Sequence, residues 1–117
     1  MTGLLTDLYE LTMAAGYFEA GKSTQKATFE LFIRRLPRQR NFIIAAGLAQ
    51  CVDYLLNLRF TTEEIDYLRE LPQFGRVSSG FFDYLRDFRF TGDLFAVPEG
   101  TPLQSLRIVS PWVESVR

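Results

Sequence analysis

Four arginines lie within seven residues of this chain, at Arg34, Arg35, Arg38 and Arg40. A guanidinium group presents parallel N–H donors that match two oxygens of a phosphate, so this cluster suits a phosphorylated ligand. An ordinary solvated turn explains Arg38 and Arg40 equally well. The whole chain has 13 basic and 14 acidic residues and a net charge of −1, so any anion site must be local. No general attraction to nucleic acid or to an anionic membrane is expected.

Few other residues could act as catalysts or metal ligands, because the sequence has no histidine. Neither a Ser-His or Cys-His nucleophile nor a histidine metal site can be built, and we predict no catalytic residue and no metal ligand in the chain. The one cysteine, Cys51, excludes an internal disulfide and fits a reducing cytoplasm; we expect it in the core. Glu99, within the turn-rich segment 98–102, is assigned a structural role rather than that of a general base.

The opening segment 4–13, LLTDLYELTM, predicts the start of a helix. Thr6 and Asp7 stand where a side-chain oxygen can accept the free backbone N–H groups of a first helical turn. Glu10 follows Asp7 at the spacing of a capping box. A helix is therefore expected from this point to the turn near Gly21.

This helix is predicted to carry two apolar stripes at helical spacing. The residues of the first stripe are Leu8, Leu11, Ala15 and Phe18, and those of the second are Tyr9, Met13 and Tyr17. A single core face needs only one stripe. We therefore expect the helix to be buried on most sides or to lie in an interface between subunits.

The remaining elements alternate between strands and helices and predict an α+β fold. Strands are expected at 27–33, 42–46, 94–97 and 106–109. Helices are expected at 48–58, from Thr61 or Thr62 to Leu71, and after Ser78-Ser79. We predict one N-terminal domain over residues 1–117 and expect it to be truncated at its C-terminal end. The longest uncharged apolar stretch, 41–52, is well short of the ~20 residues of a membrane helix.

The motif T-D-L-Y-x-L-T-M at residues 6–13 resembles the opening of nicotinate phosphoribosyltransferases. Further segments resemble that family's N-terminal region in the same order: FELFIRR at 29–35, AGL at 46–48, FTGD at 90–93 and PEGT at 98–101. The resemblance covers nearly all of the chain but only the N-terminal part of such an enzyme. It implies the α+β N-terminal domain of that fold, with the catalytic α/β barrel missing.

The resemblance also implies three substrate-binding residues. Tyr9 matches a tyrosine that stacks against the pyridine ring of the substrate, in an active site completed by a neighbouring subunit. Offset stacking on a rigid phenol contributes roughly 0.5 to 1.5 kcal/mol beyond the area buried. Arg34 matches an arginine that reaches phosphate oxygens of substrate bound to the partner subunit, and Asp7 is the third candidate. Simple packing of Tyr9 in a helix interface is the alternative, and Asp7 also suits a first helical turn.

The function implied for the full-length enzyme is that of a transferase in NAD biosynthesis, a glycosyltransferase also classed as a ligase. It joins nicotinate to phosphoribosyl pyrophosphate with the assistance of ATP, giving nicotinate mononucleotide and pyrophosphate. Nicotinamide presents the same ring face, and the choice of nicotinate rests on the wider motif match. Magnesium and a phosphorylated histidine belong to the barrel, so this chain alone is expected to be inactive.

The expected setting is a cytoplasmic homodimer when full length, with neither nucleic acid nor membrane as partner. The alternative is a truncated, non-catalytic binding or dimerisation module of the same family, which the two stripes of the first helix favour. A binder of single-stranded nucleic acid would use the phenylalanines at 81, 82, 88, 90 and 95, but their spacing indicates core positions instead.

Overall fold

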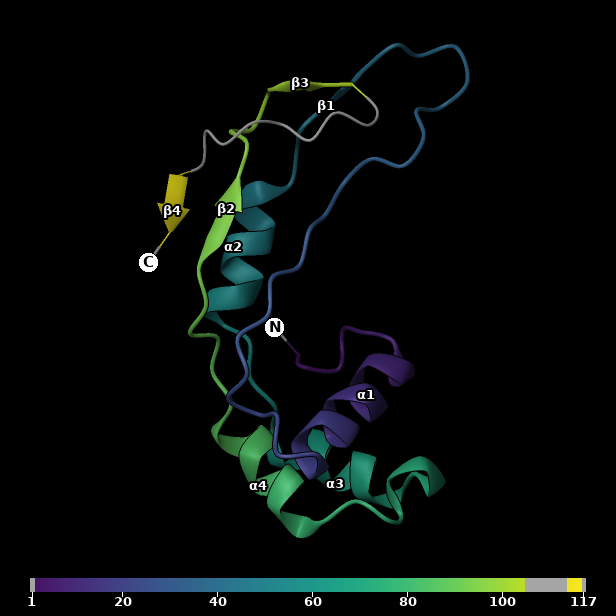
Figure 1. Ribbon diagram of the computed structural model, residues 1–117, viewed down its shortest axis with the longest axis vertical. Coiled ribbons are helices and arrows are strands. Elements are labelled where there is room, and N and C mark those ends of the chain that lie inside the picture. Colours follow the sequence, from purple (N-terminus) through teal and green to yellow (C-terminus); the bar gives the residue numbers. More distant parts are fainter. Residues whose placement is uncertain (1, 105–113, 117) are drawn as a thin grey trace. The chain divides into compact units, whose positions relative to one another are not determined.

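The computed structural model of the protein describes residues 2–104 and 114–116 (Figure 1). Its helices are α1 (Leu8–Glu19), α2 (Leu48–Leu56), α3 (Thr62–Glu70), the short 3-10 helix η1 (Pro72–Phe74) and α4 (Ser79–Asp87). Its strands are β1 (Ile43–Ile44), β2 (Leu94–Ala96), β3 (Pro102–Leu103) and β4 (Glu114–Val116). This mixture of helices and short antiparallel strands has the predicted α+β character.

The chain divides into two compact units, which are described separately. The first unit comprises Met1–Ala27 and Tyr54–Phe90, and the second comprises Thr28–Asp53 and Thr91–Arg117. The first therefore contains α1, α3, η1 and α4, whereas the second contains the four strands and the start of α2. The prediction of a single N-terminal domain stays a prediction.

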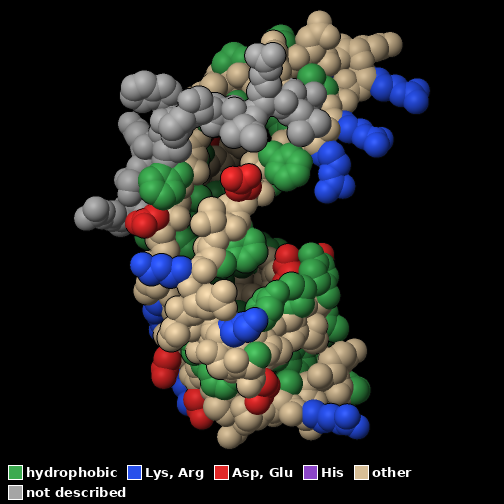
Figure 2. Space-filling view, in the orientation of Figure 1, with side chains coloured by type: hydrophobic (Ala, Val, Ile, Leu, Met, Phe, Trp, Pro, Cys, Tyr) green, Lys and Arg blue, Asp and Glu red, His purple; other side chains and the backbone are tan. Residues whose placement is uncertain are grey.

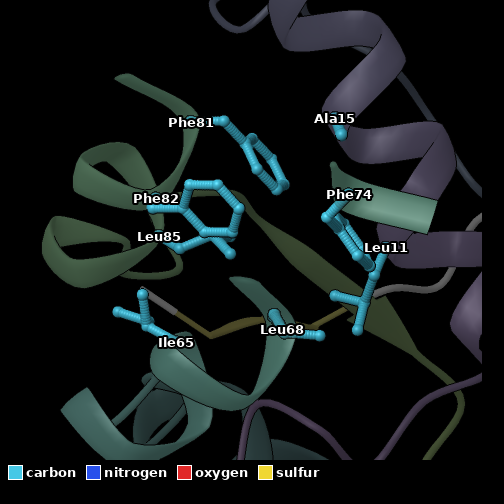
Figure 3. Packing of buried hydrophobic residues seen from close by; sticks show 8 residues of the cluster. All are labelled: Leu11, Ala15, Ile65, Leu68, Phe74, Phe81, Phe82 and Leu85. Carbon is cyan, nitrogen blue, oxygen red and sulfur yellow. The ribbon is translucent and has the colours of Figure 1, made fainter. Parts of the chain in front are cut away.

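A hydrophobic core holds the first unit together (Figure 3). Its buried residues come from α1, α3, η1 and α4: Leu11, Ala15, Ile65, Leu68, Phe74, Phe81, Phe82 and Leu85. The ring of Phe81 is fully buried and meets Phe82 edge to face, with 5.7 Å between ring centroids. Phe18 approaches the same ring edge to face at 5.8 Å. These are the geometries that aromatic quadrupoles favour, so the pairs add to the stabilisation from burial.

Local capping sets the starts of α1 and α3, as their sequences predict. The Asp7 N–H donates to Glu10 Oε2 at 3.1 Å, and the Thr6 hydroxyl donates to the same carboxylate. At α3 the Thr61 N–H donates to Glu64 Oε2 at 2.8 Å, while the Glu64 N–H donates back to Thr61 Oγ1 at 3.2 Å. Both helices thereby satisfy backbone donors within three residues of sequence.

A long-range cap joins α1 to α4. The backbone N–H and the hydroxyl of Ser78 both donate to Glu19 Oε1, at 2.9 and 2.6 Å. These bonds, the hydroxyl first, hold the pKa of Glu19 below its ordinary value. Glu19, the last residue of α1, therefore stabilises the start of α4. Residue spacing in the sequence does not indicate this contact.

The second unit contains two separate antiparallel pairs of strands. Ile43 lies opposite Leu103 in the β1–β3 pair, and Leu94 lies opposite Val116 in the β2–β4 pair. Beyond β1 the ladder continues, because the Ala45 N–H donates to the Thr101 carbonyl oxygen at 2.9 Å.

In the second unit, the side chain of Glu99 caps the start of α2. Its Oε1 accepts hydrogen bonds from the N–H of Gly47 at 2.7 Å and of Ala49 at 3.4 Å. Gly47 has φ +97°, which favours glycine at this turn into the helix. Glu99 therefore has a structural role in this cap, in addition to the expected turn, in which the Thr101 N–H donates to the Pro98 carbonyl oxygen at 3.2 Å.

Three expectations from the sequence are wrong in or next to the second unit. Residues 27–33 form no strand, because neither strand pair offers them a ladder and period-two alternation alone cannot supply hydrogen-bond partners. Cys51 is exposed instead of buried, because α2 buries no residue against any described element. Phe95 is likewise exposed rather than in a core. The expected strand 106–109 lies outside the described residues.

Candidate functional site

Two of the three predicted site residues lie together at the start of α1. Asp7 is the exposed N-cap of the helix, and Tyr9 follows two residues later in its first turn. The Tyr9 side chain is 59% exposed, although it sits on a helix that also contributes to the core. An exposed phenol on a packed helix is available to a ligand or to a second protein surface.

The segment before α1 is held against the start of α3. The Gly3 N–H donates to the Arg59 carbonyl oxygen at 3.0 Å, and the Thr2 hydroxyl donates to the Glu64 carboxylate. Gly3 packs so closely that an added Cβ would lie 2.5 Å from the Phe60 ring. These contacts fix the entry to α1 and hence the position of Tyr9. Sequence reasoning missed Gly3 and Phe60, because their contact joins positions far apart in the chain.

Tyr54 is a further residue that the sequence does not single out. Partial burial raises the pKa of its phenol, and the nearby carboxylates of Glu10 and Glu64 raise it further. Those two carboxylates are the ones that cap α1 and α3. Tyr54 therefore keeps its proton well above neutral pH and adds a neutral hydroxyl beside the capped helix starts.

The two apolar stripes of α1 have different environments. Leu11 and Ala15 of the first stripe are buried in the core. Tyr9, Met13 and Tyr17 of the second stripe are all exposed, with Tyr17 at 51%. The described residues bury Leu11 and Ala15 of the first stripe, leave its Leu8 40% exposed and cover no residue of the second stripe. Within the described part of the chain, α1 is therefore not buried on most sides. The second stripe, Tyr9–Met13–Tyr17, presents an uncovered apolar surface around the candidate site.

Arg34 belongs to the second unit, in the loop that precedes β1. Arg34, Arg35, Arg38 and Arg40 are all exposed, and Figure 2 shows Lys and Arg side chains gathered over this loop. A turn shapes its tip, because the Arg40 N–H donates to the Pro37 carbonyl oxygen at 3.2 Å. In the described segments no ion pair involves these guanidinium groups; the salt bridge found joins Arg86 to Asp83. Their N–H donors are available to phosphate oxygens.

The described residues do not form a metal site on their own. Over residues 2–104 and 114–116, no three His, Cys, Asp or Glu side chains cluster closely enough to hold a metal ion. In the same ranges, no helix has the length and apolar character needed to cross a membrane.

Comparison with known proteins identifies the family. The sequence profile of the nicotinate phosphoribosyltransferase (NAPRTase) N-terminal domain matches residues 4–116. The chain belongs to this family. The resemblance drawn from the opening motif and the four later segments is thereby confirmed.

Curated members of the nicotinate phosphoribosyltransferase family agree. A nicotinate phosphoribosyltransferase of Mycobacterium tuberculosis is 43% identical over 116 residues, which are 96% of this chain and 24% of that protein. Nicotinate phosphoribosyltransferase 2 of Arabidopsis thaliana is 40% identical over 103 residues, covering 86% of this chain and 18% of the relative. Nicotinate phosphoribosyltransferase of Bos taurus is 41% identical over 100 residues, which are 84% of this chain and 18% of that protein. The chain therefore spans at most 24% of the length of these relatives, all transferases by name.

Proposed function

We propose that this chain forms the N-terminal part of a nicotinate phosphoribosyltransferase that joins nicotinate to phosphoribosyl pyrophosphate. The products are nicotinate mononucleotide and pyrophosphate, and ATP assists the reaction, which places the enzyme in NAD biosynthesis. The observation that carries the proposal is the family match over residues 4–116, within which Tyr9 is exposed at a fixed helix start. The bond-forming step belongs to a barrel that this chain does not include, so the chain alone is inactive.

Tyr9 and Asp7 have different tasks in this proposal. The exposed Tyr9 ring stacks on the flat pyridine of nicotinate, which needs no charge on the protein. The Asp7 carboxylate repels the carboxylate of nicotinate but accepts hydrogen bonds from hydroxyl groups. We therefore assign Asp7 to the ribose hydroxyls of phosphoribosyl pyrophosphate, next to the stacked ring.

Arg34 binds phosphate oxygens of substrate held on the partner subunit of a homodimer. Support comes from its exposed guanidinium group, its place in an arginine-rich loop and the absence of an ion-pair partner among the described residues. A bidentate guanidinium–phosphate contact is charge-assisted and directional, so it both binds and orients the substrate. Magnesium and ATP are bound by the barrel, and no step is assigned to them here. Assembly in the cytoplasm is part of the same proposal.

A chimera tests the proposal. This chain would replace the matching 24% of the Mycobacterium tuberculosis relative, and nicotinate-dependent release of pyrophosphate would be measured. We expect activity in the chimera and none in the 117-residue chain alone. Activity of the isolated chain, or an inactive folded chimera, would contradict the proposal.

The role of Tyr9 is tested in the same chimera with a matched pair. Tyr9→Ala should raise the KM for nicotinate about two- to twelvefold, as expected when stacking worth roughly 0.5 to 1.5 kcal/mol is lost. Tyr9→Phe should stay near the parent value. The control is Tyr67→Ala, since Tyr67 is a tyrosine of the same unit on α3 with 55% of its side chain exposed. Equal KM values for Tyr9→Ala and Tyr67→Ala would remove Tyr9 from the substrate site.

A second candidate function is a non-catalytic binding or dimerisation module of the same family. The observation that favours it is the exposed Tyr9–Met13–Tyr17 stripe, which offers an apolar surface without any chemistry. Sedimentation of the isolated chain separates the two functions. Self-association that Met13→Glu abolishes, together with an inactive chimera, would support the module over the enzyme.

A further inference from the structure

The short segment that leads into α1 is held at both ends by carboxylates. At its far end the Asp7 N–H donates to Glu10 Oε2 at 3.1 Å. At its near end the Thr2 hydroxyl donates to the carboxylate of Glu64, which is in the first turn of α3. Tyr9 follows Asp7 by two residues, so the position of its backbone depends on both attachments.

The hydroxyl of Thr2 takes part in two hydrogen bonds. It donates to Glu64, and its oxygen accepts from the Leu4 N–H at 3.0 Å. A hydroxyl has a single O–H donor, and the bond to Glu64 uses it. The backbone adds a bridge between Thr2 and Arg59, beside which the Gly3 N–H donates to the Arg59 carbonyl oxygen at 3.0 Å. Several partners therefore fix the orientation of the Thr2 side chain at once.

The carboxylate of Glu64 is a fixed partner for this hydroxyl, because it is held by α3 itself. Its Oε2 accepts from the Thr61 N–H at 2.8 Å, while its Oε1 accepts from the Thr2 hydroxyl. The partly buried phenol of Tyr54 lies near the carboxylates of both Glu64 and Glu10. The two attachment points of the segment therefore lie close to one side chain of the first unit.

We infer that Thr2 and Glu64 form a positioning pair, which holds Tyr9 where its ring stacks on the pyridine of nicotinate. Neither residue touches the substrate. The hydrogen bond between them fixes the segment, and the segment fixes the start of α1. This inference rests on the proposed function, because it gives a task to the position of Tyr9. A displaced ring loses stacking contact although its own chemistry is unchanged, so loss of the pair weakens nicotinate binding.

A matched pair of substitutions at Thr2 tests the inference in the chimera with the Mycobacterium tuberculosis relative. Thr2→Val keeps the branched shape and removes the hydroxyl, whereas Thr2→Ser keeps the hydroxyl. We expect Thr2→Val to raise the KM for nicotinate by about twofold or more, as for loss of a weak hydrogen bond, with kcat unchanged. Thr2→Ser should keep the parent KM. Equal KM values for the two variants would overturn the inference.

A double variant shows whether Thr2 acts through Tyr9. If it does, Thr2→Val should leave the KM of a Tyr9→Ala chimera unchanged, because the ring that it positions is already gone. Two independent effects would multiply instead. A further rise in KM in the Tyr9→Ala background would contradict the positioning role, and so would a Tyr9→Ala chimera with the parent KM.

Thr61→Val is the control for a merely structural effect. It removes the acceptor of the Glu64 N–H at the start of α3 but neither of the hydrogen bonds of the Thr2 hydroxyl. We expect a lower melting temperature of the chimera, as for a lost helix cap, and an unchanged KM for nicotinate. If Thr61→Val raised the KM as much as Thr2→Val, loss of the α3 cap would explain both and the pair would have no positioning role.

A readout without activity separates this inference from the proposed function. NMR resonances of the Tyr9 ring in the 117-residue chain, assigned with Tyr9→Phe, should shift in Thr2→Val and stay in place in Thr2→Ser. Unshifted resonances in Thr2→Val would overturn the positioning pair, whether or not the chimera is active or folds with this substitution. Shifted resonances together with an inactive, folded parent chimera would overturn the proposed function and leave the pair as a device that positions Tyr9.

Discussion

The two units of this chain use apolar side chains in opposite ways. In the first unit four helical elements face one another and bury Phe74, Phe81 and Phe82. In the second unit Phe29 and Phe95 are just as apolar but remain exposed, and no residue in 28–53 or 91–104 is buried. The difference shows that apolar content alone does not make a core. Opposing surfaces are needed, and the described part of the second unit does not supply them to itself.

Truncating a phenylalanine in each unit is the strongest test of this contrast. Phe81→Ala removes a fully buried ring and should lower the free energy of unfolding by about 3–5 kcal/mol. Phe29→Ala removes an exposed ring of the same kind and should change it by no more than ~0.5 kcal/mol. Urea denaturation followed by circular dichroism measures both. Similar losses for the two variants would mean that the second unit has a core after all.

Two glycine-to-alanine substitutions in the first unit should change the free energy of unfolding in opposite directions. Gly3→Ala brings a Cβ to 2.5 Å from the Phe60 ring and should destabilise the chain by about 1–3 kcal/mol. Gly16→Ala, inside α1 with no atom within 4 Å of the new Cβ, should stabilise it by about 0.5–1 kcal/mol. Thermal unfolding of both variants gives the comparison. A stable Gly3→Ala protein would show that the entry to α1 is loosely packed.

In the second unit, the loss of a hydrogen bond should lower stability more than the loss of an apolar side chain. Glu99→Ala removes the acceptor for the Gly47 and Ala49 N–H groups and should cost about 0.5–2 kcal/mol, the range for a lost helix cap. Amide exchange at Gly47 and Ala49 should become faster. Glu30→Ala is the control, because Glu30 is exposed and caps no helix. Unchanged exchange in Glu99→Ala would mean that α2 holds its start without the carboxylate.

The smallest expected effect is the pH dependence of the cap between α1 and α4. Because the pKa of Glu19 is lowered in the folded chain, its contribution to stability is full above the unfolded pKa. The contribution is lost as the pH falls through the folded value. The melting temperatures of the parent and Glu19→Gln should therefore differ at pH 7 and converge in acid. A constant difference between pH 7 and pH 3 would show that Glu19 does not act through its charge.

Much of the first unit could be predicted because its signals are local. The capping boxes at Asp7–Glu10 and Thr61–Glu64 each act within three residues, and both helices begin where the boxes predict. The helical period also reveals the second stripe, Tyr9–Met13–Tyr17, but it predicted a helix covered on most sides and not the exposure of Tyr9 that the structure shows. The Glu19–Ser78 cap and the Gly3–Phe60 contact could not be predicted in this way, since each joins residues more than fifty positions apart.

By itself, the sequence determined the family, the helix starts and the position of Asp7 and Tyr9 in one helical turn. These follow from short-range spacing, where hydrogen bonds and the helical period act over a few residues. Only the tertiary structure decided that residues 27–33 are not in a strand of the described chain, that Cys51 is exposed and that Glu99 caps α2. Ladder pairing and burial depend on surfaces brought from elsewhere in the chain, and no local pattern states whether such a surface is present.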